Sequence, residues 1–199
     1  MSFHLVVEPT EILLRELRRR GIELIISRMA DQIAPEGTSA EVLFYDRLAV
    51  LASKRNPWVR RRRPFTLRDR IDEPWVLPPP QGFLGPMITA AFAAAGIDVP
   101  RAAVTTASSY TLASLVAHGP FLAVHPETML RVPSHKPFLT ALPVELSGAN
   151  NPIGLLRLKD RMPSPVAPLF AKELRDVVRT LGLGGGRSSH RHTSPTAQR

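Results

Sequence analysis

Two side chains near the start of the chain have the chemistry and the predicted placement to bind an anion. Thr10 stands where a helix is expected to begin, so its hydroxyl would lie beside backbone N–H groups that have no partner within the helix. Arg28 follows residues 22–26, an apolar run typical of a buried strand, and its guanidinium would lie at the carboxyl end of that strand. Ligands of open α/β sheets bind at that edge. The alternatives are a simple helix cap for Thr10 and a salt bridge for Arg28.

Four further residues could contact the same ligand from a second part of the chain. Gly82 permits close approach of the backbone, and Phe83 beside it offers an apolar wall. Ser108 and Ser109 precede a predicted helix, and their hydroxyl groups could donate hydrogen bonds to a ligand. The structural alternatives are a turn with a core aromatic ring at residues 82–83 and a helix cap at either serine.

No pattern in the sequence predicts catalysis or metal binding. The chain has no cysteine, which excludes disulfides, thiolate nucleophiles and cysteine zinc sites. His118 and His125 lack the spacing and the companion carboxylates of a metal site, and so does the sparse pair His190 and His192, so we interpret all four as incidental. There is no P-loop, dinucleotide-binding motif, nucleophile elbow or paired acid–base motif. We therefore expect no enzyme activity, no cofactor and no metal.

Composition indicates an ordinary globular protein whose positive charge is local. Of the 199 residues, 44% are hydrophobic and 22% charged, which excludes wholesale disorder and a fibrous chain. No window approaches a membrane span and no signal peptide begins the chain, so the expected location is cytoplasmic. The net charge is +9, of which residues 60–63 supply four charges and the tail after Gly182 three. Binding of nucleic acid through these arginines is a weaker alternative, because only Trp58 is near enough in sequence to stack on a base.

The elements that must position these residues alternate between strands and helices. We expect a strand at residues 3–7, a helix from residue 10 to about 20 and a strand at 22–26, which would form a βαβ unit. Further strands are expected at residues 42–52, 75–77, 102–105, 121–124, 139–144 and 153–158, and further helices after Pro86, after Ser108 or Ser109 and after Pro165. This alternation predicts an α/β fold with mainly parallel sheets.

Two of the expected strands could cross between two lobes: residues 42–52 because the strand is long, and residues 153–158 because of their position late in the chain. One would leave the first lobe and the other would return to it. The resulting domain organisation puts residues 1–45 and 153–182 in lobe I, residues 46–152 in lobe II, and residues 183–199 in a disordered tail. A ligand would bind in the cleft between the lobes.

Several segments, taken in order, resemble the effector-binding domain of LysR-type transcriptional regulators over residues 3–181. They are LRRRGIELIISR at 17–28, LFYDRLAVLASKRNPWVRRRRPFTLRD at 43–69, EPWVLPPPQGF at 73–83, AAFAAAGI at 90–97, TTASSYTLASLVAHGPFLAVHP at 105–126, and the closing helix after Pro165. The resemblance implies a two-lobe fold of the type 2 periplasmic-binding-protein kind with two crossover strands. It also implies that an anionic or polar metabolite binds between the lobes.

The same resemblance implies roles for three of the residues introduced above. Thr10 matches the position at which the loop after the family's second strand presents a hydroxyl to the cleft. Gly82 and Phe83 match the loop by which the second lobe closes on the ligand. The chain departs from the family at its beginning, since Met1 corresponds to the second strand of the effector-binding domain. We therefore expect the first strand and helix of lobe I, and the winged helix-turn-helix, to be missing.

These departures set the expected partners and the alternatives. The chain resembles a truncated regulator that would contact DNA only indirectly, through the missing winged helix-turn-helix, and that would self-associate or form mixed oligomers with a full-length regulator. Ligand binding would bias closure of the lobes. Two other interpretations stay open: a free-standing solute-binding protein of the same two-lobe fold, and a fragment without independent function. No membrane partner is expected.

Overall fold

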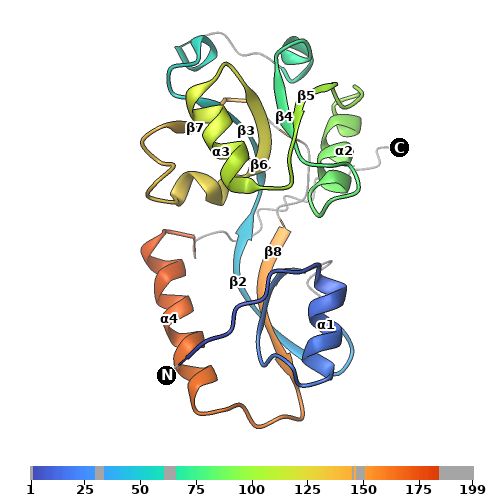
Figure 1. Cartoon of the computed structure of the whole chain (residues 1–199), viewed down its shortest axis with the longest axis vertical. Helices are drawn as coiled ribbons and strands as arrows, with labels where there is room; N and C mark the ends of the chain where they lie inside the picture. Colours follow the sequence, from blue (N-terminus) through green and yellow to red (C-terminus); the bar gives the residue numbers. More distant parts are fainter. Residues whose placement is uncertain (1, 30–33, 61–65, 145, 147–150, 184–199) are drawn as a thin grey trace, which may run out of the picture.

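The computed structural model describes residues 2–29, 34–60, 66–144, 146 and 151–183, which form two lobes stacked end to end (Figure 1). The helices are α1 (Thr10–Arg18), α2 (Gly85–Ala94), α3 (Ser109–His118) and α4 (Val166–Thr180). The strands are β1 (Ile25–Arg28), β2 (Thr38–Asp46), β3 (Leu48–Ser53), β4 (Trp75–Leu77), β5 (Ala102–Thr105), β6 (Leu122–Pro126), β7 (Leu139–Ala141) and β8 (Asn151–Leu158). Short 3-10 helices are η1 (Pro57–Arg60), η2 (Arg68–Arg70) and η3 (Glu127–Arg131). No described helix is both long and apolar enough to cross a membrane.

Lobe I consists of a three-stranded sheet in the order β1–β8–β2 with α1 and α4, and lobe II of a five-stranded sheet in the order β5–β4–β6–β3–β7 with α2 and α3 (Figure 1). The prediction of mainly parallel sheets is wrong. In lobe I, β8 pairs antiparallel with both β1 and β2, because β2 leaves for lobe II and β8 returns from it. In lobe II, β4 is parallel to β5 and β6, whereas β3 is antiparallel to β6 and β7.

The chain passes from lobe I to lobe II at Arg47, which separates β2 from β3. The single strand expected at residues 42–52 is therefore two strands that follow each other closely. Arg47 and the preceding residue, Asp46, both contact η3 of lobe II. The Asp46 carboxylate accepts a hydrogen bond of 2.7 Å from the Thr128 hydroxyl, and Arg47 forms an ion pair with Glu127. These contacts fix the first crossing to the base of lobe II.

The N-terminal segment corrects a second expectation. Residues 3–7 are extended but belong to no strand, and Leu5 and Val7 remain 79% and 96% exposed. Phe3 packs on Phe170 of α4 with 5.6 Å between ring centroids, and a groove of about 430 Å³ separates this segment from residues 21–26. The described partner of β1 is β8 alone. The expected βαβ unit does not form, because the groove lies between this segment and the outer edge of β1.

The two lobes differ in the size of their apolar cores. The five-stranded sheet of lobe II is packed on both faces: one cluster includes Trp75, Phe92 and Leu122, and the other includes Leu51 and Val116. Lobe I buries one smaller cluster, consisting of Leu13, Leu17, Ile25, Met29 and Leu156. Because hydrophobic stabilisation scales with the apolar area removed from water, lobe II is expected to be the more stable lobe.

The core of lobe II supplies the first prediction. Phe92 is fully buried and meets Trp75 edge to face, with ring centroids 5.7 Å apart. Replacing Phe92 by Ala should lower the free energy of unfolding by about 3–5 kcal/mol, because it removes buried area and leaves a cavity. Urea unfolding followed by tryptophan fluorescence measures this loss, since Trp58 and Trp75, the two tryptophans of the chain, both lie in lobe II.

The control for this measurement is Phe83→Ala. Phe83 is 60% exposed, so its loss should change the free energy of unfolding by no more than about 0.5 kcal/mol. Equal unfolding midpoints for Phe92→Ala and Phe83→Ala would contradict the core assignment.

Candidate functional site

A pocket of about 380 Å³ lies where the two lobes face each other. Residues from both lobes and from the second crossing contribute to its walls: Thr10, Glu11, Arg28, Met29, Pro35, Asn151 and Leu156 from lobe I, and Phe83 and Met87 from lobe II. Its volume is in the range of small-molecule sites. Three of the residues selected from the sequence, Thr10, Arg28 and Phe83, are thus brought to one pocket.

Arg28 is the dominant polar group of this pocket. It is the last residue of β1, where it stands opposite Ile153 of β8, and its side chain is half-buried. Its Nε and Nη1 atoms are buried without a hydrogen-bond partner in the described part of the chain. Burial lowers the pKa of Arg28, and the nearby Asp46 carboxylate opposes that shift. A guanidinium with two unsatisfied donors is costly to bury alone, and an anion that accepts a charge-assisted hydrogen bond from Nε or Nη1 would offset part of that cost.

Asp46 does not neutralise Arg28 directly. Its carboxylate accepts from the Thr128 hydroxyl and, at 3.3 Å, from the Thr128 backbone N–H, so its hydrogen bonds go to lobe II. Burial is the main cause that raises the pKa of Asp46, while the Thr128 hydrogen bonds and the charge of Arg28 favour its ionised form. Asp46 therefore leaves the Arg28 Nε and Nη1 atoms without a hydrogen-bond partner among the described residues.

Thr10 is held near Arg28 by its contact with Ser27, the residue that precedes Arg28 in β1. The Thr10 and Ser27 hydroxyl oxygens are 2.6 Å apart, which joins the start of α1 to β1. Thr10 does not cap the helix: the N-cap of α1 is Pro9, and no side chain caps it. The cap interpretation of Thr10 is therefore wrong, because its hydroxyl has turned from the helix toward the strand. Thr10 lines the pocket, whereas its partner Ser27 lies behind it and is not part of the pocket wall.

The loop before α2 delivers the apolar side of the pocket. The Gly82 N–H donates to the Pro79 carbonyl at 2.8 Å, and a Cβ atom at Gly85 would lie 2.0 Å from the Pro80 carbonyl oxygen. Only glycine fits so close an approach at position 85, so the chain turns tightly into α2 and leaves Phe83 exposed toward the cleft. Gly82 shapes this turn but is not itself part of the pocket wall.

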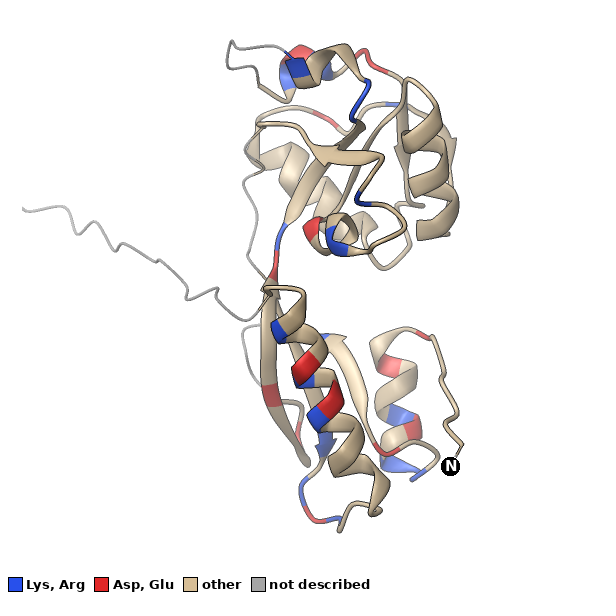
Figure 2. Cartoon of the chain, turned by 90° about the vertical axis from the view of Figure 1, so that its left-hand side faces the viewer, with Lys and Arg blue, Asp and Glu red and all other residues tan. Residues whose placement is uncertain are grey.

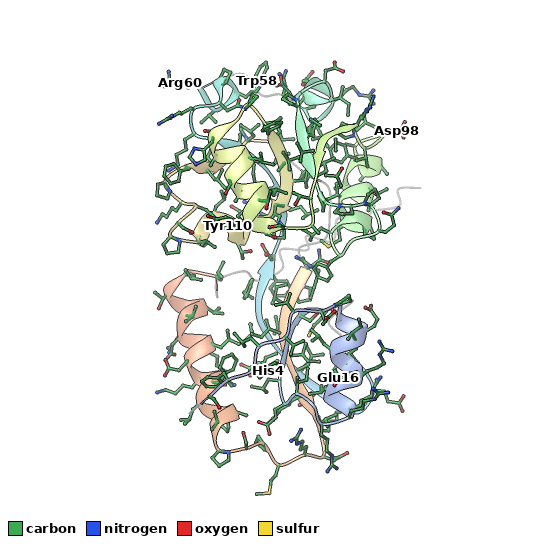
Figure 3. The ribbon with its side chains drawn as sticks, viewed as in Figure 1. His4, Glu16, Trp58, Arg60, Asp98 and Tyr110 are labelled. Atoms are coloured by element: carbon green, nitrogen blue, oxygen red, sulfur yellow. The ribbon has the colours of Figure 1, made fainter. Side chains whose placement is uncertain are left out.

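Ser108 and Ser109, at the start of α3, have different surroundings. Ser108 is the N-cap, and its hydroxyl accepts a hydrogen bond from the Thr111 N–H at 3.2 Å, as one of the two cap alternatives predicted. The Ser109 hydroxyl lies 3.0 Å from Nε2 of His125. Neither serine contributes to the pocket wall. The neighbouring Tyr110 shows that this end of α3 points toward lobe I (Figure 3).

His125 is a residue that the sequence analysis treated as incidental. It lies near the end of β6, is only 9% exposed, and its Nδ1 is buried without a well-formed hydrogen bond in the described part of the chain. Burial lowers the pKa of His125 to about 4; the Pro126 backbone offsets part of this shift, and the charges of Arg28 and His135 add to it. The imidazole is therefore neutral near pH 7. The sequence does carry a signal for a functional role of His125: it directly follows the apolar run 121–124, at the carboxyl end of an expected buried strand.

Arg60, the one described residue of the arginine run, lies far from this pocket. Arg60 and Trp58 are on η1 at the end of lobe II remote from lobe I (Figure 3), whereas residues 61–63, His190 and His192 fall outside the described residues. Elsewhere basic and acidic side chains alternate, as on α4 (Figure 2). Among the residues that can be described, no group of three or more His, Asp or Glu is placed to hold a metal ion.

Comparison with known proteins identifies related sequences. The family model described as the LysR substrate binding domain matches residues 1–179. The transcriptional regulator GbpR of Azospirillum brasilense is 26% identical over 175 residues, which are 88% of this chain and 51% of that protein. The regulator GalR of Pseudomonas putida is 25% identical over 170 residues, 85% of this chain and 42% of that protein. The chain thus spans about half the length of the curated relatives it matches.

Solved structures show the same fold at low sequence identity. The apo regulatory domain of HypT from Salmonella typhimurium superposes with a TM-score of 0.69 at 18% identity, covering 90% of this chain and 83% of that one. The effector-binding domain of QuiR in complex with shikimate gives a TM-score of 0.62 at 17% identity, covering 86% and 78% of the two chains. Both are regulatory domains, and the shared architecture is a two-lobe fold of the type 2 periplasmic-binding-protein kind.

The lowered pKa of His125 predicts a pH effect on stability. In the unfolded chain His125 is protonated below a pKa of about 6.5, whereas in the folded protein it stays neutral down to about pH 4. The free energy of unfolding therefore decreases as the pH is lowered from 6.5 to 4. The substitution His125→Gln removes this contribution. Between pH 7.5 and pH 5 wild type should lose roughly 2 kcal/mol more unfolding free energy than the variant, measured by urea unfolding.

His4→Gln is the control for this comparison, because it changes an exposed histidine and should follow wild type at both pH values. A parallel decline of wild type and His125→Gln would show that His125 is protonated in the folded protein at pH 5.

Proposed function

This chain belongs to the LysR substrate-binding domain family, and we propose that it senses a small anionic or polar metabolite bound between its two lobes. The observation that carries the proposal is the Arg28 guanidinium, which faces the interlobe pocket with two buried donors unused by the described residues. A carboxylate is a group that would accept charge-assisted hydrogen bonds from such donors. The QuiR domain, of the same fold, is described with the carboxylate shikimate.

The remaining contacts divide between the lobes. Thr10, oriented by Ser27, would add a hydroxyl contact beside the carboxylate, and Phe83 with Met87 would cover the apolar part of the ligand from lobe II. Gly82 would let the loop approach closely, and Ser108 and Ser109 would face the ligand from the start of α3. Because the two lobes contribute different groups, a ligand that touches both has a higher affinity for the closed arrangement and shifts the population toward it.

Regulation of transcription is the role we propose for this closure. GbpR and GalR, which extend well beyond the matched region, are described as HTH-type transcriptional regulators. In such a regulator closure would be transmitted through contacts between copies to the DNA-binding part, and the protein would act in the cytoplasm without an enzymatic step. Such contacts would be made by self-association or in mixed oligomers with a full-length regulator.

Substitution of Arg28 by Gln tests the site. With a panel of small carboxylates and isothermal titration calorimetry, the variant should bind any carboxylate that wild type binds at least tenfold more weakly, because a charge-assisted hydrogen bond contributes about 1.5–3 kcal/mol. Without ligand the variant should be as stable as wild type or more so, because it removes a partly buried charge that lacks hydrogen-bond partners.

Arg15→Gln provides a matched control, since Arg15 is exposed on α1 and outside the pocket. It should leave carboxylate affinity unchanged. Wild-type affinity in Arg28→Gln would remove Arg28 from the site, and failure of every carboxylate to bind wild type would overturn the proposed function.

A further inference from the structure

The Ser109–His125 pair on lobe II has hydrogen-bonding properties that complement those of Arg28. Helix α3 is already capped by Ser108, so Ser109 is not needed for that role. The Ser109 hydroxyl is on an exposed residue, whereas its partner His125 is nine-tenths buried at the end of β6. A fixed, buried imidazole therefore holds an accessible hydroxyl on the side of lobe II that faces lobe I.

The protonation state of His125 sets the direction of this hydrogen bond. A neutral imidazole carries one N–H and one acceptor nitrogen. Nε2 faces the Ser109 hydroxyl, so the tautomer that lets Nε2 accept is the one with the ring proton on Nδ1. Nε2 then accepts from the Ser109 hydroxyl, and the lone pairs of the Ser109 oxygen are directed outward. The pair thus presents an uncharged hydrogen-bond acceptor.

The charges around the pocket limit the ligand to one anionic group. Arg28 is the cation among the described residues that line it, and Glu11 is the anion. Asp46 acts on Arg28 from the crossing between the lobes. A second carboxylate on the ligand would meet Glu11 and Asp46 without a second cation, which is unfavourable at short range. A neutral donor, such as a hydroxyl, has no such cost.

Resting on the proposed function, we infer that Ser109 is a specificity-determining residue that accepts a hydrogen bond from a ligand hydroxyl, and that the effector is a hydroxylated monocarboxylate. Arg28 binds the carboxylate from lobe I, and Ser109 accepts the hydrogen bond of the ligand hydroxyl from lobe II once the lobes close. His125 is a positioning residue, since it acts through the Ser109 hydroxyl.

Paired probes test this inference, each a hydroxylated carboxylate with its counterpart lacking the hydroxyl groups: glycolate with acetate, lactate with propionate, and shikimate with 1-cyclohexenecarboxylate. Calorimetry measures the affinity ratio within each pair. Wild type should favour the hydroxylated member of at least one pair by roughly tenfold, about the contribution of one neutral hydrogen bond. Ser109→Ala should reduce this ratio to near one while leaving the affinity for the deoxygenated member unchanged.

Two further variants separate positioning from structure. His125→Leu, which cannot accept a hydrogen bond, should lose the ratio, and His125→Gln, whose amide can still accept one, should restore much of it. Thr111→Ala removes another exposed hydroxyl of α3 and should keep the wild-type ratio. Thermal unfolding of each variant establishes that it is folded before its ratio is compared.

The outcomes distinguish this inference from the proposed function. Arg28-dependent binding with a ratio near one in every wild-type pair would overturn the role of Ser109 and leave the carboxylate site standing. A wild-type ratio that persists in Ser109→Ala, or that is lost equally in Thr111→Ala, would also overturn it. Absence of binding by all six probes would remove the proposed function together with the inference that rests on it.

Discussion

Lobe I depends on one strand, β8, that enters it from the far side of the molecule. β8 lies between β1 and β2 and is hydrogen-bonded antiparallel to both, so neither outer strand pairs with the other. The same register places the cation of the candidate site, because Arg28 stands opposite Ile153 at the end of β8 nearest lobe II. The sheet and the site are therefore positioned by the same hydrogen-bond ladder. Any shift of β8 by one residue would turn the side chains of β8 to the other face of the sheet and place a different residue opposite Arg28.

The candidate site places a partly buried positive charge where its nearest anion is already engaged. The Asp46 carboxylate accepts its hydrogen bonds from Thr128, which connects the first crossing to lobe II. Arg28 is therefore attracted to the charge of Asp46 without forming a hydrogen bond to it. An Arg28–Asp46 salt bridge would be satisfied without a ligand. Its absence leaves Arg28 as the group on which the proposed binding of an anion would depend. The hydroxyls and apolar side chains around it then decide which anion fits.

Local patterns in the sequence predicted the helices and the pocket residues better than they predicted the sheets. Pro86 and Gly96 correctly bounded α2, and Arg28 was found because a cation after an apolar run is a local signal. Strand direction was missed because it follows from the path of β8, which no local pattern records. Residues 3–7 have strand composition, but a strand also needs a neighbour. His125 was passed over because its partner Ser109 is brought beside it only by the packing of α3 on the sheet.

Lobe II is built from one continuous stretch of chain, with all its strands between Leu48 and Ala141, whereas lobe I draws on both ends of the chain. During synthesis the N-terminal residues leave the ribosome first, yet β1 and β2 have no ladder partner until Asn151–Leu158 has been made. Lobe II can complete its core before that moment. The sheet of lobe I can therefore be completed only after the whole of lobe II has been synthesised, and the candidate site, which needs both lobes, cannot form earlier than that.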